Sequence, residues 1–239
     1  MPLYLVATPI GNLADSSARA QEVLARAHVL AAEDTRSARR LLSALEIPLG
    51  GRELVSYGEH NEKGMAPRLG EVLRAGRDVA LLSEGGTPLV SDPGYRLVRE
   101  AIASGVAVVP VPGPCAAVAA LAGSGLPVHA FLFRGFLPRK PGARRRILRA
   151  LKEREETLIF YEAPQRLAKL LPELAEVLGP QRRACVAREL TKLHETFHRG
   201  TLGELRELFS AANAPKGECT VLVAGASERP PNGTPEIPE

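Results

Sequence analysis

A glycine- and proline-rich segment in the first half of the chain carries the residues best suited to holding a ligand. It reads Ser83-Glu84-Gly85-Gly86-Thr87-Pro88-Leu89-Val90-Ser91-Asp92-Pro93-Gly94. The adjacent glycines would let the backbone pass close to a ligand, because a Cβ there would clash or forbid a positive φ. Amides exposed in such a turn can hold an adenosine or a carboxylate group, and Asp92 can accept a hydrogen bond from a ribose hydroxyl or an ammonium. Two ordinary turns and a helix cap would explain the same residues equally well.

Similar residues follow four other short apolar runs in this half of the chain. The loops are residues 8–15, 33–36, 58–62 and 112–116, and each contains glycine, proline or charge. Ligands of open parallel sheets bind beyond the carboxyl ends of the strands, so we expect the five loops to lie at one edge of a sheet and to form the site. The chain has neither a G-x-G-x-x-G nor a P-loop pattern, and ordinary dinucleotide and P-loop nucleotide sites are therefore not expected.

An alternation of short apolar runs and amphipathic stretches would position these loops. We predict strands at residues 3–7, 29–32, 53–57, 79–83 and 106–111, and helices near residues 20–27, 38–45, 65–73 and 97–102. Ser16 or Ser17 is expected to cap the first helix and Thr35 the second, while Gly76 and Gly105 suit helix C-termini. This alternation predicts a mostly parallel sheet with helices on its faces.

A proline-rich crossing at residues 110–114 is the expected domain boundary. It divides the chain into α/β domains at residues 1–112 and 113–226, followed by a polar tail, 227–239, that is expected to be disordered. In the second domain we predict strands at residues 131–136, 157–161, 184–188, 195–198 and 219–223. The predicted helices lie near residues 143–153, 166–178 and 202–209, and Pro172 is expected to kink or split the second of them.

The composition sets limits on the setting of the protein. With 239 residues, 45% of them apolar, the chain can bury a substantial core. Its N-terminus lacks the pattern of a signal or transit peptide, and no apolar run is long enough to span a membrane. Cys115, Cys185 and Cys219 lie far apart without metal-ligand spacing, so we expect no zinc site, no disulfide and a reduced, cytoplasmic setting.

Several motifs occur together and in order along the chain. They are Thr8-Pro9-Ile10-Gly11-Asn12-Leu13, Ala32-Glu33-Asp34-Thr35-Arg36, Gly86-Thr87-Pro88-Leu89-Val90-Ser91-Asp92-Pro93-Gly94, Pro112-Gly113-Pro114, Ala187-Arg188-Glu189-Leu190-Thr191-Lys192 and Lys216-Gly217-Glu218. With them the chain closely resembles the small-subunit ribosomal RNA cytidine 2′-O-methyltransferases of the tetrapyrrole methylase superfamily, over roughly residues 2–225. The resemblance implies a mostly parallel N-terminal sheet, a mixed C-terminal sheet, S-adenosylmethionine in the cleft between the domains, and usually a homodimer. It also implies that the substrate is a cytidine of 16S ribosomal RNA.

The resemblance also assigns site residues. Those expected at the cofactor are Pro9, Gly11, Ser83, Glu84, Gly85, Gly86, Thr87, Ser91, Asp92, Pro112, Gly113, Ala116, Tyr161 and Glu162. Those expected at RNA are Arg36, Arg139, Lys140, Arg144, Arg145, Arg146 and Arg188, and no metal is expected. The family usually has Asp-Ala where this chain has Glu84-Gly85, and a histidine where it has Gln165. A catalytic histidine at that last position is excluded in this chain.

Basic side chains gather between residues 134 and 154. Such a run is more often a solvated helix face than a binding surface, but the resemblance favours docking on ribosomal RNA through phosphates. With only six Phe and four Tyr in the chain, base stacking is not an obvious recognition device, and RNA shape is expected to decide the target.

Methyl transfer from a sulfonium is an in-line displacement, so alignment is the larger task and a base must help the ribose hydroxyl lose its proton. Candidates for that base are Lys192, whose pKa would fall if it were buried, Glu189, His60 and Glu59. A strand-end ion pair for Glu189 and Lys192 and a helix cap or packed ring for His60 are equally good explanations. Gly86→Val is expected to abolish RNA methylation.

Two other functions also fit the sequence. One is a small-molecule or protein methylase of the same superfamily, and the other is a non-catalytic RNA-binding assembly factor that keeps the fold.

Overall fold

The computed structural model describes residues 1–210 and 217–228 of the chain. It divides into two compact units, Met1–Cys115 and Ala116–Glu239, and this division falls a few residues beyond the boundary predicted after residue 112. Lys216 and most of the tail predicted to be disordered lie outside the described residues. No helix in the described part of the chain is long and apolar enough to cross a membrane.

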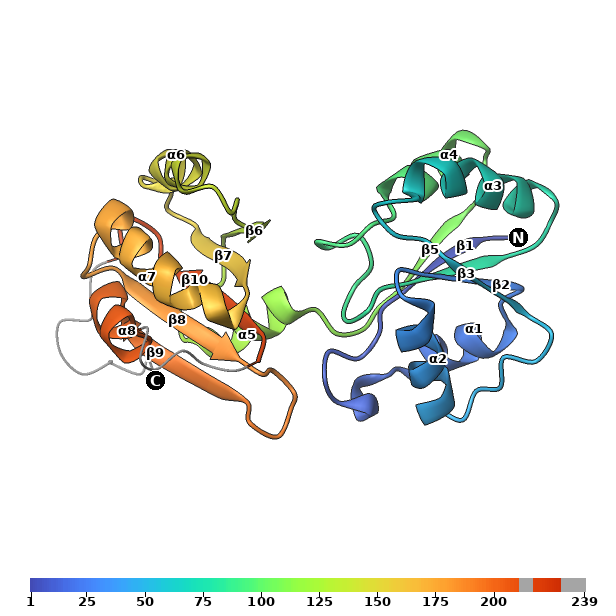
Figure 1. Ribbon diagram of the computed structural model, residues 1–239, viewed down its shortest axis with the longest axis horizontal. Coiled ribbons are helices and arrows are strands. Elements are labelled where there is room, and N and C mark those ends of the chain that lie inside the picture. Colours follow the sequence, from blue (N-terminus) through green and yellow to red (C-terminus); the bar gives the residue numbers. More distant parts are fainter. Residues whose placement is uncertain (211–216, 229–239) are drawn as a thin grey trace, which may run out of the picture. The chain divides into compact units, whose positions relative to one another are not determined.

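Five parallel strands form the sheet of the N-terminal unit. They are β1 (Leu3–Val6), β2 (Val29–Ala32), β3 (Glu53–Ser56), β4 (Val79–Leu82) and β5 (Val108–Val111), in the order β3-β2-β4-β1-β5. The helices are η1 (Leu13–Asp15), a short 3-10 helix, α1 (Ala18–Arg26), α2 (Thr35–Ala44), α3 (Glu62–Arg74) and α4 (Tyr95–Ala103). Helices α1 and α2 cover one face of the sheet, and α3 and α4 cover the other (Figure 1). The predicted parallel sheet with helices on its faces is confirmed.

The central strands β2 and β4 of this sheet are buried on both sides. Leu30 and Leu82 face the core under α1 and α2, whereas Ala31 and Leu81 face the core under α3 and α4. A strand that is buried on both faces reads as a continuous apolar run, which is how β2 and β4 appear in the sequence. The loops that leave these strands therefore start from rigid, fully packed ends.

Capping residues explain where several helices begin and end. The Ser17 side chain accepts a hydrogen bond from the amide of Ala20, as predicted for α1. The cap of α2 is Asp34, which accepts from the amide of Arg36, so the prediction of Thr35 was wrong by one residue. Gly76 and Gly105 follow α3 and α4 with φ of 79° and 68°, the left-handed conformation expected at a helix C-terminus.

The C-terminal unit has a mixed sheet, as expected. Its strands are β6 (Phe131–Phe136), β7 (Thr157–Glu162), β8 (Arg183–Arg188), β9 (Thr196–Thr201) and β10 (Cys219–Val223), in the order β6-β7-β10-β8-β9. Strands β6 and β7 are parallel, and the remaining pairs are antiparallel. The helices are α5 (Ala116–Ser124), α6 (Pro141–Leu151), α7 (Pro164–Leu178) and α8 (Leu202–Leu208). Helices α6, α7 and α8 pack on one apolar core of this sheet.

Two helices of this unit differ from their predictions. Helix α5 was not predicted, because its alanine-rich sequence has no polar face and so gives no amphipathic period. It packs against β7, β8 and β10, and a Cβ at Gly123 would lie 2.5 Å from the ring of Phe197, so only glycine allows this close approach. Helix α7 continues through Pro172 as one helix, and the predicted split does not occur.

A buried ion pair joins α6 to α7. Arg144 is 6% exposed, and its Nε and Nη2 donate to the two carboxylate oxygens of Glu173 at 2.7 and 2.5 Å. Its Nη1 donates to the carbonyls of Pro138 and Arg139 at 3.1 and 3.2 Å. Arg144 therefore stabilises the fold. Its buried guanidinium is occupied by Glu173 and two carbonyls, so it is not available to bind an RNA phosphate as predicted.

We expect Arg144→Ala to destabilise the C-terminal unit by about 3–5 kcal/mol, because it leaves the buried Glu173 carboxylate without its partner. The matched control is Arg145→Ala on the same helix, which removes an exposed pair with Glu176 and should cost about 0–1 kcal/mol. Urea unfolding of the two variants measures the difference. Equal losses would show that the Arg144 pair adds no more than a surface pair.

Candidate functional site

The loops after β1 and β4 are joined by a reciprocal pair of backbone hydrogen bonds. The amide of Thr8 donates to the carbonyl of Gly86, and the amide of Gly86 donates to the carbonyl of Thr8, both at 2.9 Å. The two strands are neighbours in the sheet, so their loops leave the same edge side by side. The predicted meeting of strand-end loops is confirmed for these two.

Hydroxyl groups extend this connection. Ser83 Oγ donates to the carbonyl of Gly86 at 2.6 Å and lies 3.3 Å from Thr8 Oγ1, and all three residues are buried. Thr87 Oγ1 donates to the carbonyl of Pro114 at 3.0 Å, which brings in the loop after β5. The Ser83 and Thr87 hydroxyls, expected at the cofactor, thus hold three loops together.

The segment 83–94 departs repeatedly from ordinary backbone geometry. Gly86 and Gly94 have φ of 93° and 141°, and Leu89 and Ser91 have φ of 71° and 69° despite having side chains. Strained conformations of this kind persist where packing enforces them, and they gather at functional sites. Gly85 has no positive φ, so the backbone requires a glycine at Gly86 and not at Gly85.

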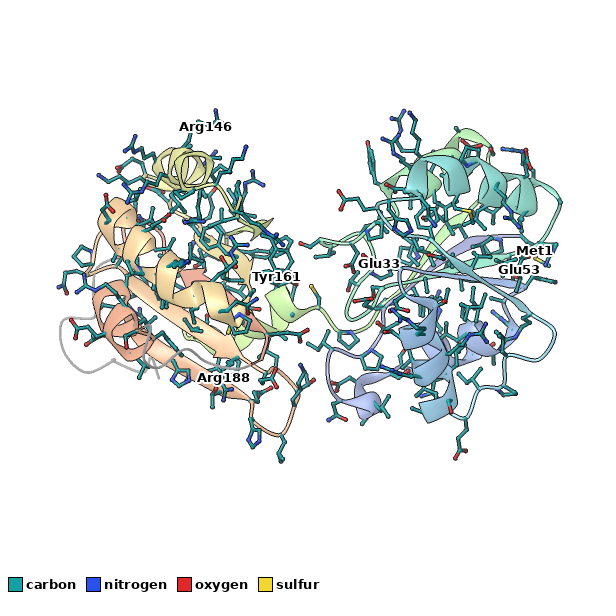
Figure 2. The ribbon with its side chains drawn as sticks, in the orientation of Figure 1. Met1, Glu33, Glu53, Arg146, Tyr161 and Arg188 are labelled. Atoms are coloured by element: carbon teal, nitrogen blue, oxygen red, sulfur yellow. The ribbon has the colours of Figure 1, made fainter. Side chains whose placement is uncertain are left out.

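Three carboxylates crowd the same edge of the sheet. Glu33 follows β2, while Glu84 and Asp92 follow β4 (Figure 2 labels Glu33). Burial, followed by the charges of Glu33 and Glu84, raises the pKa of Asp92 to about 6. Burial and the charges of Glu84 and Glu59 also raise the pKa of Glu33. This edge of the sheet therefore favours a cation.

A small pocket opens beside these carboxylates. It encloses about 50 Å³ and is lined by residues that include Pro9, Glu33, Ser83 and Glu84. These come from the loops after β1, β2 and β4. Among the other residues expected at the cofactor, Gly11, Ser91, Pro112 and Gly113 are exposed, and Ala116 is half-buried. A Cβ on Gly113 would lie 2.9 Å from that of Ala7, so this loop runs tightly against the end of β1.

Glu62 supports the end of the candidate site, and the sequence did not reveal this role. Its Oε1 accepts from the amides of Gly94 and Arg96 at 3.0 and 3.1 Å and from the Tyr57 hydroxyl at 3.2 Å. It thereby caps α4 from the start of α3 and fixes the end of segment 83–94. Burial and the Glu62 carboxylate raise the pKa of Tyr57. No local motif signals such a cap, because donor and acceptor lie far apart in the sequence.

Tyr161 and Glu162 end β7 in the C-terminal unit. The Tyr161 hydroxyl accepts from the amide of Ala117 at the start of α5, at 3.1 Å. Glu162 is 3% exposed, accepts from the amide of Ala163 at 2.9 Å, and lies 3.2 Å from Nε of Arg166. Burial raises the pKa of Glu162, although Ala163 and Arg166 oppose this. The structure thus gives both side chains partners within their own unit.

Lys192 bridges two carboxylates. Its Nζ lies 3.0 Å from Glu189 and 2.9 Å from Glu218, and the Glu218 amide donates to the same Glu189 oxygen at 3.0 Å. Burial lowers the pKa of Lys192, but the hydrogen bonds and charges of the two carboxylates outweigh it, and the net shift is upward. The hydrogen bond from Lys192 lowers the pKa of Glu189. The condition for a fall in the Lys192 pKa, burial without partners, is not met, and the structure shows the ion pair that the sequence left open.

The remaining predicted residues are distributed over both units. His60 is exposed after β3 and lies near Glu33. Arg36 is exposed and pairs with Asp34 at 3.1 Å, while Arg188, labelled in Figure 2, donates to Thr196 and to the carbonyl of His194. On and before α6, Arg139, Lys140 and Arg146 are exposed, and Arg146 points away from the helix in Figure 2. No group of side chains able to hold a metal ion occurs among the described residues.

Comparison with known proteins places these features in a family. The family of tetrapyrrole (corrin/porphyrin) methylases matches residues 2–206. The chain is 53% identical to ribosomal RNA small subunit methyltransferase I of Mesorhizobium japonicum, over 95% of this chain and 76% of that protein. It is 50% identical to the protein of the same name from Pseudomonas aeruginosa, over 93% and 78%. The fold also matches a Thermus thermophilus uroporphyrin-III C-methyltransferase complexed with S-adenosylhomocysteine, with a TM-score of 0.64, 24% identity and coverage of 93% and 97%.

We expect Gly86→Ala to destabilise the N-terminal unit by about 1–2 kcal/mol, because alanine must adopt a left-handed conformation there. Its added Cβ would also lie 3.3 Å from Ile10. Gly85→Ala is the matched control, since Gly85 has ordinary φ and its Cβ would make only van der Waals contact. Chemical denaturation separates the two. An equal loss in both variants would contradict the special role of Gly86.

Proposed function

Because this chain belongs to the tetrapyrrole (corrin/porphyrin) methylase family, we propose that it transfers a methyl group from S-adenosylmethionine to a cytidine 2′-hydroxyl of 16S ribosomal RNA. The observation that carries the proposal is its identity of 53% and 50% with two proteins named ribosomal RNA small subunit methyltransferase I, over nearly its whole length. We further propose that it acts in the cytoplasm as a homodimer.

The N-terminal unit fits a cationic cofactor. S-adenosylmethionine carries a positive sulfonium, whose methyl group it supplies when bound. Glu33, Glu84 and Asp92 repel one another, and a cation near them would relieve that repulsion. Backbone groups of residues 84–86 and 112–113 would hold its neutral parts, since the Ser83 and Thr87 hydroxyls already serve the loops.

The chain contributes mainly alignment to the reaction. Two rigid α/β units offer fixed loops, and in-line transfer to a neutral leaving group depends on such positioning. Lys192, with its raised pKa, would be protonated at neutral pH, so it stabilises negative charge on RNA or on its carboxylate neighbours and does not accept the proton. His60, on the loop beside Glu33, is the residue of this chain that we assign to accept the hydroxyl proton.

Binding of S-adenosylmethionine should weaken as the pH falls from 7.5 to 5. Asp92 has a pKa of about 6, so in this interval it becomes protonated and loses its attraction for the sulfonium. S-adenosylhomocysteine lacks that charge and should show a smaller pH dependence. Calorimetric titration of both ligands measures the effect. Parallel pH profiles for the two ligands would remove Asp92 from contact with the sulfonium.

The same shift predicts how stability depends on pH. Because folding raises the Asp92 pKa from 3.8 to about 6, the protonated form favours the folded state, and that advantage is lost as the pH rises from about 4 to about 6. Asp92→Asn should therefore raise the melting temperature at pH 7, leave it unchanged near pH 3.5 and weaken cofactor binding. If the variant melts at the same temperature as the unchanged protein at pH 7, the ionised Asp92 carboxylate does not destabilise the folded state.

Incubation with labelled S-adenosylmethionine and small ribosomal subunits that lack the modification tests the proposal itself. Methylation of a cytidine 2′-hydroxyl is expected, and the combined variant Arg139→Glu, Lys140→Glu and Arg146→Glu should raise KM at least tenfold with a reduced salt dependence. Arg40→Glu, an exposed change on α2, is the control and should have little effect. Cofactor binding without methylation of any RNA would contradict the proposed function.

A further inference from the structure

Three of the six phenylalanines lie on the edge strand β6, at positions 131, 133 and 136. Side chains alternate along a strand, so residues 133 and 136 would ordinarily point to opposite faces. Here the pairing with β7 shifts by one residue between Phe133 and Gly135, and Gly135 has a φ of 66°. This bulge absorbs Arg134 and returns Phe136 to the face that carries Phe131 and Phe133.

The same face presents Tyr161 from the neighbouring strand β7. Phe136 is directly opposite Tyr161 in the pairing, and their ring centroids lie 5.6 Å apart. Phe133 also contacts Tyr161, with ring centroids 4.9 Å apart in an edge-to-face arrangement. Tyr161 thus supports the ring of Phe136, which remains 57% exposed. An aromatic ring that is held in place yet open to solvent is a stacking surface.

A groove of about 790 Å³ begins at Phe136. Its walls are the loop after β6, with Leu137, Pro138 and Arg139, and the start of α7, with Ala163, Gln165 and Arg166. The groove lies at the carboxyl ends of β6 and β7, the parallel pair of this sheet, where ligands of such sheets bind. Its volume is in the range of sites for small ligands.

Two guanidinium groups hold the wall of this groove, that of the buried Arg144 and that of the partly exposed Arg166. Arg166 Nη2 donates to the carbonyl of Leu137 at 3.0 Å, and Arg144 Nη1 donates to those of Pro138 and Arg139. Three successive carbonyls are therefore fixed by two arginines. The exposed side chains of Arg139 and Lys140 leave this fixed backbone beside the stacking surface.

The charge around the groove identifies its occupant. Residues 131–152 contain eight Arg and Lys and no Asp or Glu, and although Arg144 and Arg145 pair with Glu173 and Glu176, the exposed Arg139 forms part of the groove wall. Phosphate groups match this charge, and a base matches the open aromatic ring. A base in a duplex already has stacked neighbours on both faces, so only an unpaired nucleotide can offer a free face to Phe136.

We propose that Phe136, supported by Tyr161, stacks on an unpaired base of the RNA substrate, with Arg139 on the adjoining phosphate. This inference rests on the proposed function. It adds recognition of a single-stranded nucleotide to the recognition of RNA shape. The few aromatic residues of the chain do serve base stacking, because the bulge in β6 gathers them.

Tryptophan provides a direct test, since the chain contains none. Phe136→Trp should show strong fluorescence quenching when a hexacytidylate RNA is added, because a stacked base quenches indole. Phe131→Trp is the matched control, on the same face of the same strand roughly 16 Å away. It should be quenched much less. A base-free ribose-phosphate hexamer should quench neither variant.

Affinity gives a second readout. Phe136→Leu keeps an apolar side chain but loses the aromatic face, and should weaken hexacytidylate binding about 5- to 150-fold while binding of a duplex RNA stays unchanged. Phe136 is exposed, so both variants should melt like the unchanged protein. Equal quenching at both tryptophans, or unchanged affinity in Phe136→Leu, would overturn the stacking assignment. So would quenching of Trp at position 136 by S-adenosylhomocysteine in competition with the hexamer, which would assign the surface to the cofactor.

A parallel assay separates this inference from the proposed function. The unchanged protein is tested for methylation of small subunits that lack the modification. If it methylates them while Phe136→Leu has the same KM, the stacking surface fails and the function stands. If the unchanged protein methylates no RNA, the function fails, and the hexacytidylate titration still decides whether Phe136 binds a base.

Discussion

The two hydrogen bonds between Thr8 and Gly86 are the constraint on which the N-terminal site depends. They tie together the loops of neighbouring strands just beyond the sheet, where the regular ladder has ended. The connection requires Gly86 at a φ of 93°, and the Ser83 hydroxyl donates a second hydrogen bond to the Gly86 carbonyl. Thr87 then carries the connection to the loop after β5. Backbone amides and carbonyls are thereby held at fixed positions, a precondition for aligning a reaction that depends on geometry.

The same tie concentrates negative charge. The charge of Glu84 raises the pKa of Glu33 and of Asp92, and the charge of Glu33 also raises that of Asp92, an arrangement that works against folding. Such opposition between stability and site chemistry is common where a site is built to receive an opposite charge. In the C-terminal unit, by contrast, charged side chains are paired with opposite charges. Lys192 is neutralised by Glu189 and Glu218, and Arg144 by Glu173, so those charges are already satisfied within the fold.

Features with a local cause could be predicted from the sequence. The strands, the loops that follow them and the helix ends at Gly76 and Gly105 depend on periodicity and on turn chemistry, which are written in adjacent residues. Features that depend on distant partners could not. Glu62 caps a helix more than thirty residues away, and Arg144 looked like one more member of a basic run until the fold placed it on Glu173. Helix α5 gave no signal, because a helix that is apolar all round has no period to detect.

The aromatic residues show how a count can mislead where an arrangement matters. Six phenylalanines in 239 residues are few, yet a single extra residue in β6 brings three of them to one face with Tyr161. A bulge of this kind is invisible to a period-two pattern, because it breaks the pattern at the position that matters. Arginine shows a similar division of labour within one short stretch. Arg144 and Arg166 donate hydrogen bonds to three successive carbonyls. The exposed side chain of Arg139 therefore extends from a backbone that these bonds hold in place. The paired arginines thus fix the backbone from which the exposed Arg139 side chain extends, and a site is more precise when a rigid element carries it.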